Sequence, residues 1–561
     1  MYVLGIWDGH DAGAALIKDS NIIAAVNEER YTKRKLDVGF PANSIRACLN
    51  IAKIKPEEVK VIAAATSDLA KTLTRIFPSV KEYYYQFRRR KAKPNFQHPK
   101  RAFKYKLTQF GPNFITTGLS ESLIKINLKN LGFSNYKFVI YDQHMCHAAG
   151  VFMSNMKKAL VITLDGVGDG KSGSVNIFEN NKLKRISSIS SRDSLGIFFE
   201  QVTNLLGMRE LEDEGKVMAL SNYAYPVQDK DNKMLSLFEV KGLNIKARYS
   251  VTRQYSFLKN LLWNTQREQF AYMAQKTLEI KMLELFANAI KQTKIRDVCW
   301  SGGVASNIKA NMLVRKIAHD WYVFPAMGDG GLALGAALLA NNEFYKISSY
   351  KNEDIYFGDG FSNREIEEVL KKSKGIKYAK ERDIAKKVAG LVLSGKIVLW
   401  FQGRTEFGPR ALGNRSILAS AESYGIKDTL NMMVKNRDWF QPFCPSLLEE
   451  DARLIFCDYD NRPARFMTMG YMVKKDRMKQ MANVINVDNS ARPQMVGNEN
   501  MLFRRLLLEV KKRNKLGVVL NTSFNIHGMP ICNTPQDAII VLKATRCRYL
   551  AIGNFMVEQK S

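Results

Sequence analysis

Residues 3–29, VLGIWDGHDAGAALIKDSNIIAAVNEE, decide the fold. The apolar runs VLGIW, GAALIK and NIIAAV are separated by short polar turns rich in Gly and Asp. Apolar runs of this length, bounded by Gly, Asp and Asn, are typical of strands. The stretch therefore predicts strand, turn, strand, turn and strand in succession.

A second copy of the pattern spans residues 158–183, KALVITLDGVGDGKSGSVNIFENNKL, with a strand through Leu164, a Gly/Asp turn and another strand. One Asp-Gly turn is also an ordinary hairpin turn, but two after buried strands resemble the phosphate-binding design of actin-type and hexokinase-type ATPases. In that design, tight Gly turns bring backbone N–H groups close to phosphates, and nearby aspartates hold a metal or a water. The repeat predicts a duplicated domain of that class.

Downstream segments extend the α/β pattern. Residues 265–295 predict an amphipathic helix, and DVCWSGGVASN (297–307) and WYVFPAMGDGGLALGAALLA (321–340) each read as strand, Gly turn and helix. Residues 345–360 predict a linker to a second α/β unit. In that unit, GKIVLWFQGRTEFGPRALGNRS (395–416) and LGVVLNTSFNIHGMPI (516–531) each pair an apolar strand with a polar loop.

Length and composition set further limits. A chain of 561 residues is too long for one ordinary core, so two or more domains are expected. It has no apolar stretch of membrane-spanning length and no signal-peptide pattern. Its seven scattered cysteines, without a CxxC pair, favour reduced thiols over disulfides or structural zinc. We expect a cytoplasmic protein with no membrane partner; its oligomeric state stays open, a dimer included.

Charge indicates an anionic partner. Lys and Arg number 85 against 54 Asp and Glu, giving +31, and such an excess attracts polyanions. Residues 71–110 carry twelve Lys or Arg, one acidic residue and interleaved aromatics, which predicts a partly helical insertion suited to phosphates and exposed bases. A generally basic surface is the alternative. The candidate nucleic-acid contacts are Tyr83, Tyr84, Tyr85, Arg88, Arg89, Arg90, Lys91 and Lys93.

Five further motifs carry a family resemblance: GRTEFGPRALGNRSILA (403–419), VLNTSFNIHGMPICNTPQDAI (519–539), DNSARPQMV (488–496), DEGKVMAL (213–220) and MGDGGLALGAA (327–337). The chain resembles, over nearly its full length, carbamoyltransferases of the nodulation-protein U and antibiotic-tailoring type, such as those acting on tobramycin or cephem intermediates. The resemblance implies an N-terminal domain over residues 1–345, like the actin-like enzymes that form threonylcarbamoyladenosine. It implies a smaller C-terminal α/β domain over residues 355–561, like the partner that makes the carbamoyl adenylate.

The chemistry implied by the resemblance begins with carbamoyl phosphate and ATP as co-substrates. They give carbamoyl adenylate, whose carbamoyl group then passes to a hydroxyl. Making a mixed anhydride with AMP supplies a good leaving group, provided that the site excludes water. Anionic carbamoyl phosphate and the ATP phosphates also need fixed guanidinium and backbone donors.

The polar loops of these motifs supply the candidate residues. Arg492 fits either a ligand contact or a surface ion pair. The candidate catalytic residues are Asp8, His10, Asp11 and Lys216, with His10 expected to bind or orient the acceptor or the acyl group. The candidate carbamoyl-phosphate and ATP residues are Asp165, Gly166, Gly302, Gly303, Asn307, Arg410, Asn414, Arg415, Lys435, Arg437, Asn521, Thr522, Ser523 and Asn525.

Residues 143–147, QHMCH, follow a predicted strand that ends at Tyr141. In the family, histidines of the matching segment and an aspartate of the MGDGG loop bind iron or a similar divalent ion, which imidazole and carboxylate suit. We expect His144, His147 and Asp329 as ligands of Fe2+, or of Mg2+ or Mn2+ with the nucleotide. Gln143 stands where the family usually has a first histidine, so His144 shifts or Gln143 ligates through oxygen. A metal-free cluster of paired polar groups is the alternative.

The motifs leave the acceptor open. The +31 charge and the basic insertion favour DNA or RNA, with a hydroxymethylated pyrimidine such as 5-hydroxymethylcytosine supplying the hydroxyl. A base inside a duplex has to be flipped out, or the enzyme has to act on single strands. A small-molecule hydroxyl, on a sugar or a natural product, is the first alternative. A catalytically silent nucleic-acid-binding relative is the second.

Overall fold

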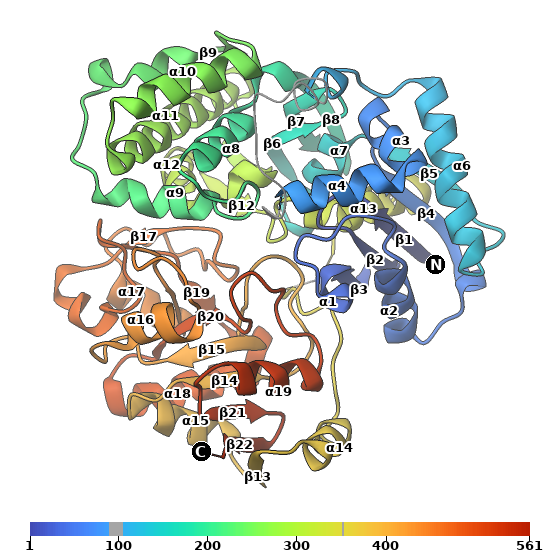
Figure 1. The fold of residues 1–561 in the computed structure, drawn as a ribbon. Coiled ribbons are helices and arrows are strands. Elements are labelled where there is room, and N and C mark those ends of the chain that lie inside the picture. Colours follow the sequence, from blue (N-terminus) through green and yellow to red (C-terminus); the bar gives the residue numbers. More distant parts are fainter. Residues whose placement is uncertain (89–104, 351–352, 561) are drawn as a thin grey trace. The chain divides into compact units, whose positions relative to one another are not determined.

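The computed structural model describes residues 1–88, 105–350 and 353–560, which form two compact units (Figure 1). Unit 1 comprises residues 1–28 and 36–352, and unit 2 comprises residues 29–35 and 353–561. The division at residue 352 lies inside the segment predicted as the linker. Both units combine strands and helices, so the α/β class is confirmed.

Unit 1 contains two five-stranded sheets. Their strands are mostly buried, in keeping with the nearly continuous apolar runs of the sequence. The first sheet consists of β1 (Tyr2–Trp7), β2 (Gly13–Lys18), β3 (Asn21–Asn27), β4 (Val59–Ala65) and β5 (Lys137–Tyr141). The second consists of β6 (Lys158–Gly168), β7 (Lys171–Glu179), β8 (Lys182–Ser190), β11 (Asp297–Ser301) and β12 (Asp320–Val323). A small hairpin adds β9 (Phe238–Lys241) and β10 (Asn244–Ala247).

The two sheets have the same topology. In the first, β1 pairs with β2 and β2 with β3, both antiparallel, while β4 and β5 continue in parallel on the other side of β1. In the second, β6, β7 and β8 form the antiparallel part, and β11 and β12 continue in parallel beyond β6. The repeated sequence motif thus builds the same five-stranded arrangement twice, which confirms the duplicated, actin-like domain.

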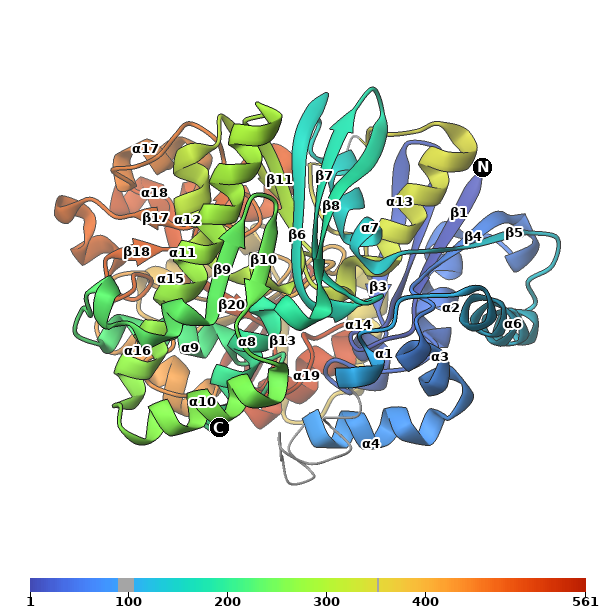
Figure 2. The ribbon, with the colours of Figure 1, turned by 90° about the horizontal axis from the view of Figure 1, so that it is seen from above.

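Two helices form the layer between these sheets. Helix α13 (Leu332–Tyr345) packs on β1, β2 and β4, and α7 (Gln143–Ala148) packs on β6 and on α13 (Figure 2). Helix α13 is buried along most of its length, as its apolar sequence requires. The layer places the residues just before α13 beside α7, and the candidate metal ligands lie there.

The remaining helices of unit 1 cover the outer faces and include the predicted helix over 265–295, which is confirmed as α11. Part of the basic insertion forms α3 and α4, and residues 105–110 are described as well, whereas residues 89–104 lie outside the described residues. The helices are α2 (Ala42–Ala52), α3 (Leu69–Ile76), α4 (Pro78–Arg88), α6 (Phe114–Asn130), α8 (Leu195–Leu205), α9 (Glu214–Leu220), α10 (Val251–Trp263), α11 (Arg267–Thr293) and α12 (Ile308–Ile317).

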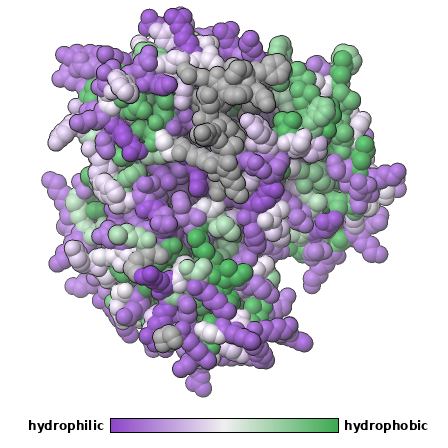
Figure 3. Space-filling model, in the orientation of Figure 1, coloured by the Kyte–Doolittle hydropathy of each residue, from purple (hydrophilic) through white to green (hydrophobic). Residues whose placement is uncertain are grey.

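The surface of unit 1 is largely hydrophilic in the view of Figure 3, with apolar side chains gathered over α6. Phe114, Ile115, Leu119 and Ile126 of that helix are exposed. None of the helices in the described part of the chain combines the length and the apolarity that a membrane span needs.

Unit 2 is built on one eight-stranded sheet in the order β13-β22-β21-β14-β15-β20-β16-β19. Its strands are β13 (Ile376–Lys380), β14 (Val398–Phe401), β15 (Arg415–Ala419), β16 (Cys444–Leu448), β19 (Gln494–Val496), β20 (Val518–Ser523), β21 (Tyr549–Ile552) and β22 (Phe555–Gln559); β17 (Tyr471–Met472) and β18 (Ser490–Ala491) pair separately. Its helices are α1 (Glu29–Thr32), α14 (Asn363–Lys372), α15 (Ile384–Leu393), α16 (Ile426–Thr429), α17 (Ala452–Ile455), α18 (Met501–Asn514) and α19 (Pro535–Ala544).

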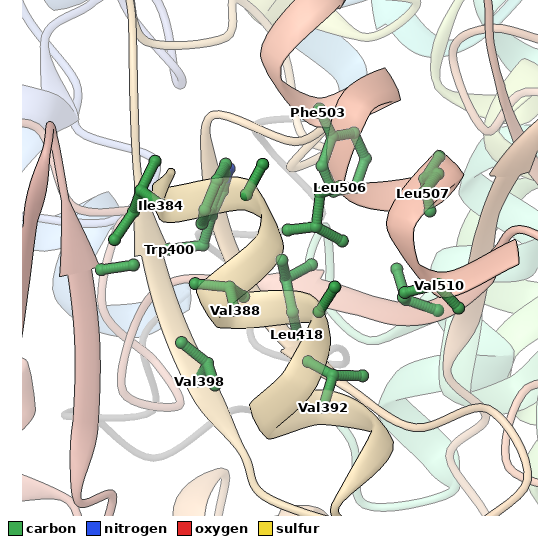
Figure 4. Close-up of a cluster of buried hydrophobic side chains, with 14 of the residues drawn as sticks. Ile384, Val388, Val392, Val398, Trp400, Leu418, Phe503, Leu506, Leu507 and Val510 are labelled. Carbon is green, nitrogen blue, oxygen red and sulfur yellow. The ribbon is translucent and has the colours of Figure 1, made fainter. Parts of the chain in front are cut away.

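The core of unit 2 lies between this sheet and the helices α15 and α18. Val388 and Val392 of α15, Phe503 and Leu507 of α18 and Trp400 of β14 belong to one buried cluster (Figure 4). Burial of such apolar side chains stabilises the fold by about 1.5 to 3 kcal/mol each. This core fixes β14, β15 and β20, and the polar loops of the C-terminal motifs adjoin the ends of these strands.

Candidate functional site

A cluster in unit 1 joins residues from three elements. His147 is on α7, Asp165 is near the end of β6, and Asp329 begins the short 3-10 turn Asp329–Gly331 before α13. One ligand atom from each lies within 4.8 Å of the others. His147 Nε2 is 3.3 Å from Asp329 Oδ1 and 3.6 Å from Asp165 Oδ2. Two of the three expected metal ligands therefore meet, and Asp165 joins them.

The cluster fits a divalent metal ion. His147 Nε2 is buried and has no hydrogen-bond partner among the described residues, although it faces two carboxylates. Two ligands bound at about 2.1 Å in tetrahedral geometry lie about 3.4 Å apart, close to the separations here. One imidazole with two carboxylates suits a first-row transition metal better than a purely oxygen-bound ion.

The three groups also shift one another's protonation. Burial lowers the pKa of His147, but the nearby carboxylates of Asp165 and Asp329 outweigh it and raise the pKa to about 9. Burial raises the pKa of Asp165, but His147, His144 and the Gly303 amide together bring it below its ordinary value. A negative pair of carboxylates therefore attracts a cation to this point, either a proton on His147 or a metal ion.

The other residues of QHMCH lie beside the cluster in different ways. His144 is outside it: its Nδ1 is hydrogen bonded to Thr163 Oγ1 at 2.9 Å, and burial lowers its pKa to about 4. Gln143 turns its amide nitrogen to the carboxylates, donating to Asp329 Oδ1 at 3.1 Å and to Asp165 Oδ2 at 3.3 Å. In this structure Gln143 therefore contacts the two candidate carboxylate ligands through its amide nitrogen and not through its oxygen.

The turn between β1 and β2 approaches the cluster from the opposite side. His10 Nε2 is 3.2 Å from Asp329 Oδ2, and the His10 side chain is partly exposed. A Cβ on Gly330 would come within 2.2 Å of Asp11 Oδ2, so any larger residue would displace the Asp11 side chain. Asn27 Nδ2 donates to the Gly330 carbonyl and holds the two loops together. The structure therefore brings His10 and Asp329 into one site and places Asp11 beside it.

The second Gly turn approaches Asp165. Gly302 has φ +93°, and a Cβ there would come within 2.1 Å of the Leu164 carbonyl oxygen. The next amide, Gly303 N–H, donates to Asp165 Oδ1 at 2.7 Å. Asn307 caps α12 and exchanges hydrogen bonds with Gln275, while the Gly166 carbonyl accepts from Ser194 Oγ. The candidate Lys216 pairs instead with Asp213 at 3.1 Å.

The described part of the basic insertion does not present all its candidates at the surface. Tyr83 of α4 is exposed, whereas Tyr85 is buried. Arg89, Arg90, Lys91 and Lys93 lie outside the described residues, and for Tyr84 and Arg88 only their place in α4 is described. Three other basic residues of the stretch, Lys71, Arg75 and Lys81, turn inward towards Asp8.

Unit 2 gathers three arginines around Cys444. Arg492 places Nε and Nη2 each 3.1 Å from Cys444 Sγ. Burial and the neighbouring Arg492 lower the pKa of Arg410 to about 9, and burial lowers that of Arg437 to about 10, with Arg492 adding to the effect. Arg437 is held by Asn431 Oδ1 at 2.7 Å and lies over the Phe443 ring. Cations brought together in this way provide an anion site.

Arg415, by contrast, is occupied by the protein itself. Its guanidinium donates to the Gln402, Gly403 and Asp359 carbonyls and lies 3.6 Å from the centroid of the Phe401 ring. Its side chain is fully buried. The same loop is held by Glu406, whose Oε1 accepts from the backbone N–H groups of residues 412, 414 and 415 at 2.8 to 3.0 Å.

The remaining unit 2 candidates form a hydrogen-bonded frame at the end of β20. Lys435 donates to Ser523 and Asn525, and burial holds its pKa well below the ordinary value. Asn521 donates to Ala411, Ser446 and Gln494, while its Oδ1 has no partner among the described residues. Asn414 donates to the Arg404 carbonyl, and Thr522 is partly exposed in β20.

The sequence reasoning missed two features of the site. It did not single out Glu406, although a carboxylate before a Gly-rich loop is able to accept from the N–H groups of that loop. It placed Asp165 with the nucleotide and not with His147; the signal was its position directly after a buried strand, in the same Asp-Gly pattern as Asp329.

Comparison with known proteins covers both units. Residues 2–338 match the family model of the carbamoyltransferase N-terminus, and residues 389–559 match that of the carbamoyltransferase C-terminus. The chain belongs to the carbamoyltransferase family. It is therefore a transferase that carries out O-carbamoyl transfer, and the resemblance read from its motifs is confirmed.

Relatives of this carbamoyltransferase match it over most of their length. The uncharacterized protein MJ1051 of Methanocaldococcus jannaschii is 32% identical, covering 99% of this chain and 99% of that protein. The nodulation protein NolNO of Sinorhizobium fredii is 30% identical, covering 98% of this chain and 79% of that protein. Among solved structures, component A of the Acidaminococcus fermentans (R)-2-hydroxyglutaryl-CoA dehydratase is 16% identical with a TM-score of 0.34, covering 61% of this chain and 98% of that chain. HypF of T. kodakarensis is 15% identical with the same TM-score of 0.34, covering 62% of this chain and 48% of that chain.

Proposed function

We propose that this carbamoyltransferase makes carbamoyl adenylate from carbamoyl phosphate and ATP and transfers the carbamoyl group to an acceptor hydroxyl. Carbamoyl phosphate and water give carbamate and phosphate; a carbamate oxygen then attacks the α-phosphorus of ATP and releases pyrophosphate. The acceptor oxygen attacks the carbonyl carbon of the adenylate and releases AMP. The observation that carries the proposal is the cluster of Arg410, Arg437 and Arg492 in unit 2.

The arginine cluster suits carbamoyl phosphate for an electrostatic reason. Burial lowers the pKa of Arg410 and Arg437, and the charge of Arg492 adds to the effect, so their cationic forms are destabilised until an anion arrives. A phosphate dianion accepts several charge-assisted hydrogen bonds and removes this repulsion. Arg415, Glu406 and Lys435 hold the surrounding loops, so in the proposal they position the site and do not contact the ligand.

In unit 1 the transfer step uses the groups around Asp329. His10 accepts the proton of the acceptor hydroxyl, and Asp329 orients and stabilises the resulting imidazolium across 3.2 Å. His147, Asp165 and Asp329 would hold a divalent ion, Fe2+ being the metal suggested by the family. When bound, such an ion supplies positive charge for phosphate or acyl oxygens. Metal content measured on the purified protein and on His147→Ala tests the ligand set; equal content in both contradicts it.

For the acceptor we propose a hydroxymethylated pyrimidine, such as 5-hydroxymethylcytosine, in DNA or RNA. A net charge of +31 and the basic, aromatic stretch 71–110 support this choice, because lysines and arginines bind phosphates and aromatic rings stack on bases. Tyr83 of α4 is exposed. A sugar or natural-product hydroxyl is the second candidate, favoured by the nodulation proteins among the relatives.

Donor activation is tested with Arg410→Met. Arg410 makes no hydrogen bond or ion pair within the described ranges, so its removal leaves the loop intact while the anion site loses a cation. We expect formation of carbamoyl adenylate to fall at least a hundredfold with thermal stability preserved. Lys281→Gln, remote in sequence and in the other unit, is the matched control and keeps parental activity. A folded Arg410→Met protein with parental turnover contradicts the donor site.

The nucleic-acid acceptor is tested with residues of the insertion. Neutralising Arg88, Arg89, Arg90 and Lys91 together removes four charges from one segment. If they contact phosphates, nucleic-acid binding weakens and its log–log salt slope flattens by about 0.7 to 0.9 per lost contact. Carbamoyl adenylate formation persists. If this variant binds nucleic acid as tightly as the parent, the insertion does not contact the acceptor. If the parent itself shows no salt-sensitive binding of nucleic acid, a small-molecule acceptor becomes the favoured hypothesis.

A further inference from the structure

Three basic side chains of the insertion converge on one carboxylate inside unit 1. Arg75 of α3 forms a two-pronged ion pair with Asp8, each contact being 2.9 Å. Lys71 Nζ is 2.9 Å from Asp8 Oδ1, and Lys81 Nζ of α4 is 4.0 Å from Asp8 Oδ2. The three basic side chains are at most 11% exposed. We call Lys71, Arg75, Lys81 and Asp8 the inner basic cluster.

The inner basic cluster holds more positive than negative charge. Arg75 and Lys71 occupy both oxygens of Asp8, and Lys71 also lies 4.4 Å from the centroid of the Trp7 ring. Burial raises the pKa of Asp68, and the charges of Lys71 and Arg75 lower it by a smaller amount. Asp68 forms an ion pair with neither of them within the described residues. Lys81 makes no hydrogen bond in the described ranges, and Asp8 is the only carboxylate acting on its pKa.

The segment outside the described residues cannot supply the missing negative charge. Residues 89–104, RRKAKPNFQHPKRAFK, contain no Asp and no Glu. Glu82, next to Lys81, is exposed on α4. Lys81 therefore shares the single carboxylate of Asp8, at 4.0 Å, with two closer cations. A desolvated ammonium with so little counter-charge is costly, and proteins keep such groups where a ligand supplies the rest.

The inner basic cluster lies beside the proposed transfer site. Asp8 directly follows β1 and precedes the turn that carries His10, and Trp7 Nε1 donates to the His10 carbonyl at 2.8 Å. His10 in turn faces Asp329. An anion bound at Lys81 therefore lies beside Asp8, which is on the same short loop as the proposed base His10.

We propose that Lys81, supported by Lys71 and Arg75, binds an anionic group of the acceptor, a phosphate ester, and so holds the acceptor hydroxyl near His10. The inference rests on the proposed function and names the chemistry of its acceptor. Phosphate matches the excess charge and accepts hydrogen bonds from an ammonium in several directions. The phosphate comes either from a phosphorylated small molecule or from a nucleic-acid backbone.

Inorganic phosphate is the first probe, because it needs no turnover. Its effect on the melting temperature is compared between the parent and Lys81→Gln; phosphate bound at the unit 2 arginines is common to both, so the difference isolates unit 1. We expect the phosphate-induced rise to fall by at least half in Lys81→Gln, to return in Lys81→Arg and to stay parental in Lys281→Gln, whose lysine is similarly shielded. Equal rises in the parent and Lys81→Gln overturn the proposal.

Stability without phosphate separates ligand binding from a structural role. If Lys81 serves to bind a ligand, Lys81→Gln melts at the parental temperature or above it without phosphate, because a desolvated charge has been removed. If Lys81 is a structural partner of Asp8, the variant melts well below the parent, and the proposal is overturned.

Matched acceptors identify the source of the phosphate. The probes are 5-hydroxymethyl-2′-deoxycytidine, its 5′-monophosphate and a single-stranded oligonucleotide containing the same base; glucose and glucose 6-phosphate form a second pair. We expect KM for the phosphate-bearing acceptor to rise at least tenfold in Lys81→Gln with kcat little changed, and KM for the uncharged partner to stay parental. Preference for the monophosphate indicates a small acceptor, and preference for the oligonucleotide indicates the backbone.

Different results would overturn the anion site at Lys81 and the proposed carbamoyl transfer. A parent that forms carbamoyl adenylate but uses phosphorylated and unphosphorylated acceptors equally overturns the anion site alone. A parent that forms no carbamoyl adenylate overturns the proposed function, and the phosphate titration then still decides whether Lys81 binds an anion.

Discussion

Replacing Arg415 by methionine tests how the donor loop of unit 2 is held. The guanidinium donates to the carbonyls of Gln402, Gly403 and Asp359, and it stacks on Phe401. Gly403 is exposed, so water replaces the lost donor there, whereas Gln402 is buried and Asp359 is partly buried. At about 1.5 to 3 kcal/mol for each hydrogen bond from a charged donor, the loss is about 3 to 6 kcal/mol.

A change of that size is readily measured by thermal unfolding. For a unit of this size, 1 kcal/mol corresponds to a shift of about 2 to 4 °C, so Arg415→Met is expected to melt about 6 to 24 °C below the parent. Arg410→Met, five residues earlier in the same loop, is the control: its guanidinium makes no hydrogen bond among the described residues, and its loss leaves the melting temperature within a few degrees. If Arg415→Met keeps parental stability and loses only activity, Arg415 is a ligand contact and the reasoning is refuted.

Three further predictions concern unit 1. Burial, with Glu200 adding, raises the pKa of Glu214 from 4.5 to about 8, so the folded state holds a proton that the unfolded state releases; stability therefore falls as pH rises from about 4.5 to 8. Glu214→Gln should flatten this fall in melting temperature, and a parental pH slope contradicts the assignment. Asp165→Asn should reduce metal content at least tenfold by elemental analysis, whereas unchanged content removes Asp165 from the ligand set. Gln143→His adds an imidazole beside Asp165 and Asp329 and should tighten metal binding; parental affinity argues that this position does not reach the ion.

The sequence predicts the fold of unit 1 well because its strands are short, apolar and separated by Gly/Asp turns. Residues 3–29 and 158–183 share this pattern: the first forms most of β1, β2 and β3, and the second forms β6 and β7 and leads into β8, which completes the same antiparallel arrangement. The meeting of His147 with Asp329 was expected from the family resemblance. That Asp165 completes their group required the structure, because β6 and the turn before α13 are far apart in sequence.

Side-chain direction could not be predicted from motifs. Arg410 and Arg415 share one loop, yet only Arg415 turns to backbone carbonyls, since its place at the start of β15 points it at the turn after β14. In the same way, Lys71 and Arg75 belong to a basic run that suggests a solvated surface. Asp8, more than sixty residues earlier, draws them inward.

The central claim, donor activation through carbamoyl adenylate, is tested most directly by mass spectrometry of the reaction without acceptor. The protein is incubated with carbamoyl phosphate and ATP, and the quenched mixture is searched for carbamoyl adenylate. The account predicts this product in the parent, its dependence on both co-substrates, and its loss in Arg410→Met. Absence of carbamoyl adenylate from the parent, with the carbamoyl group passing directly from carbamoyl phosphate to an acceptor, would contradict the account.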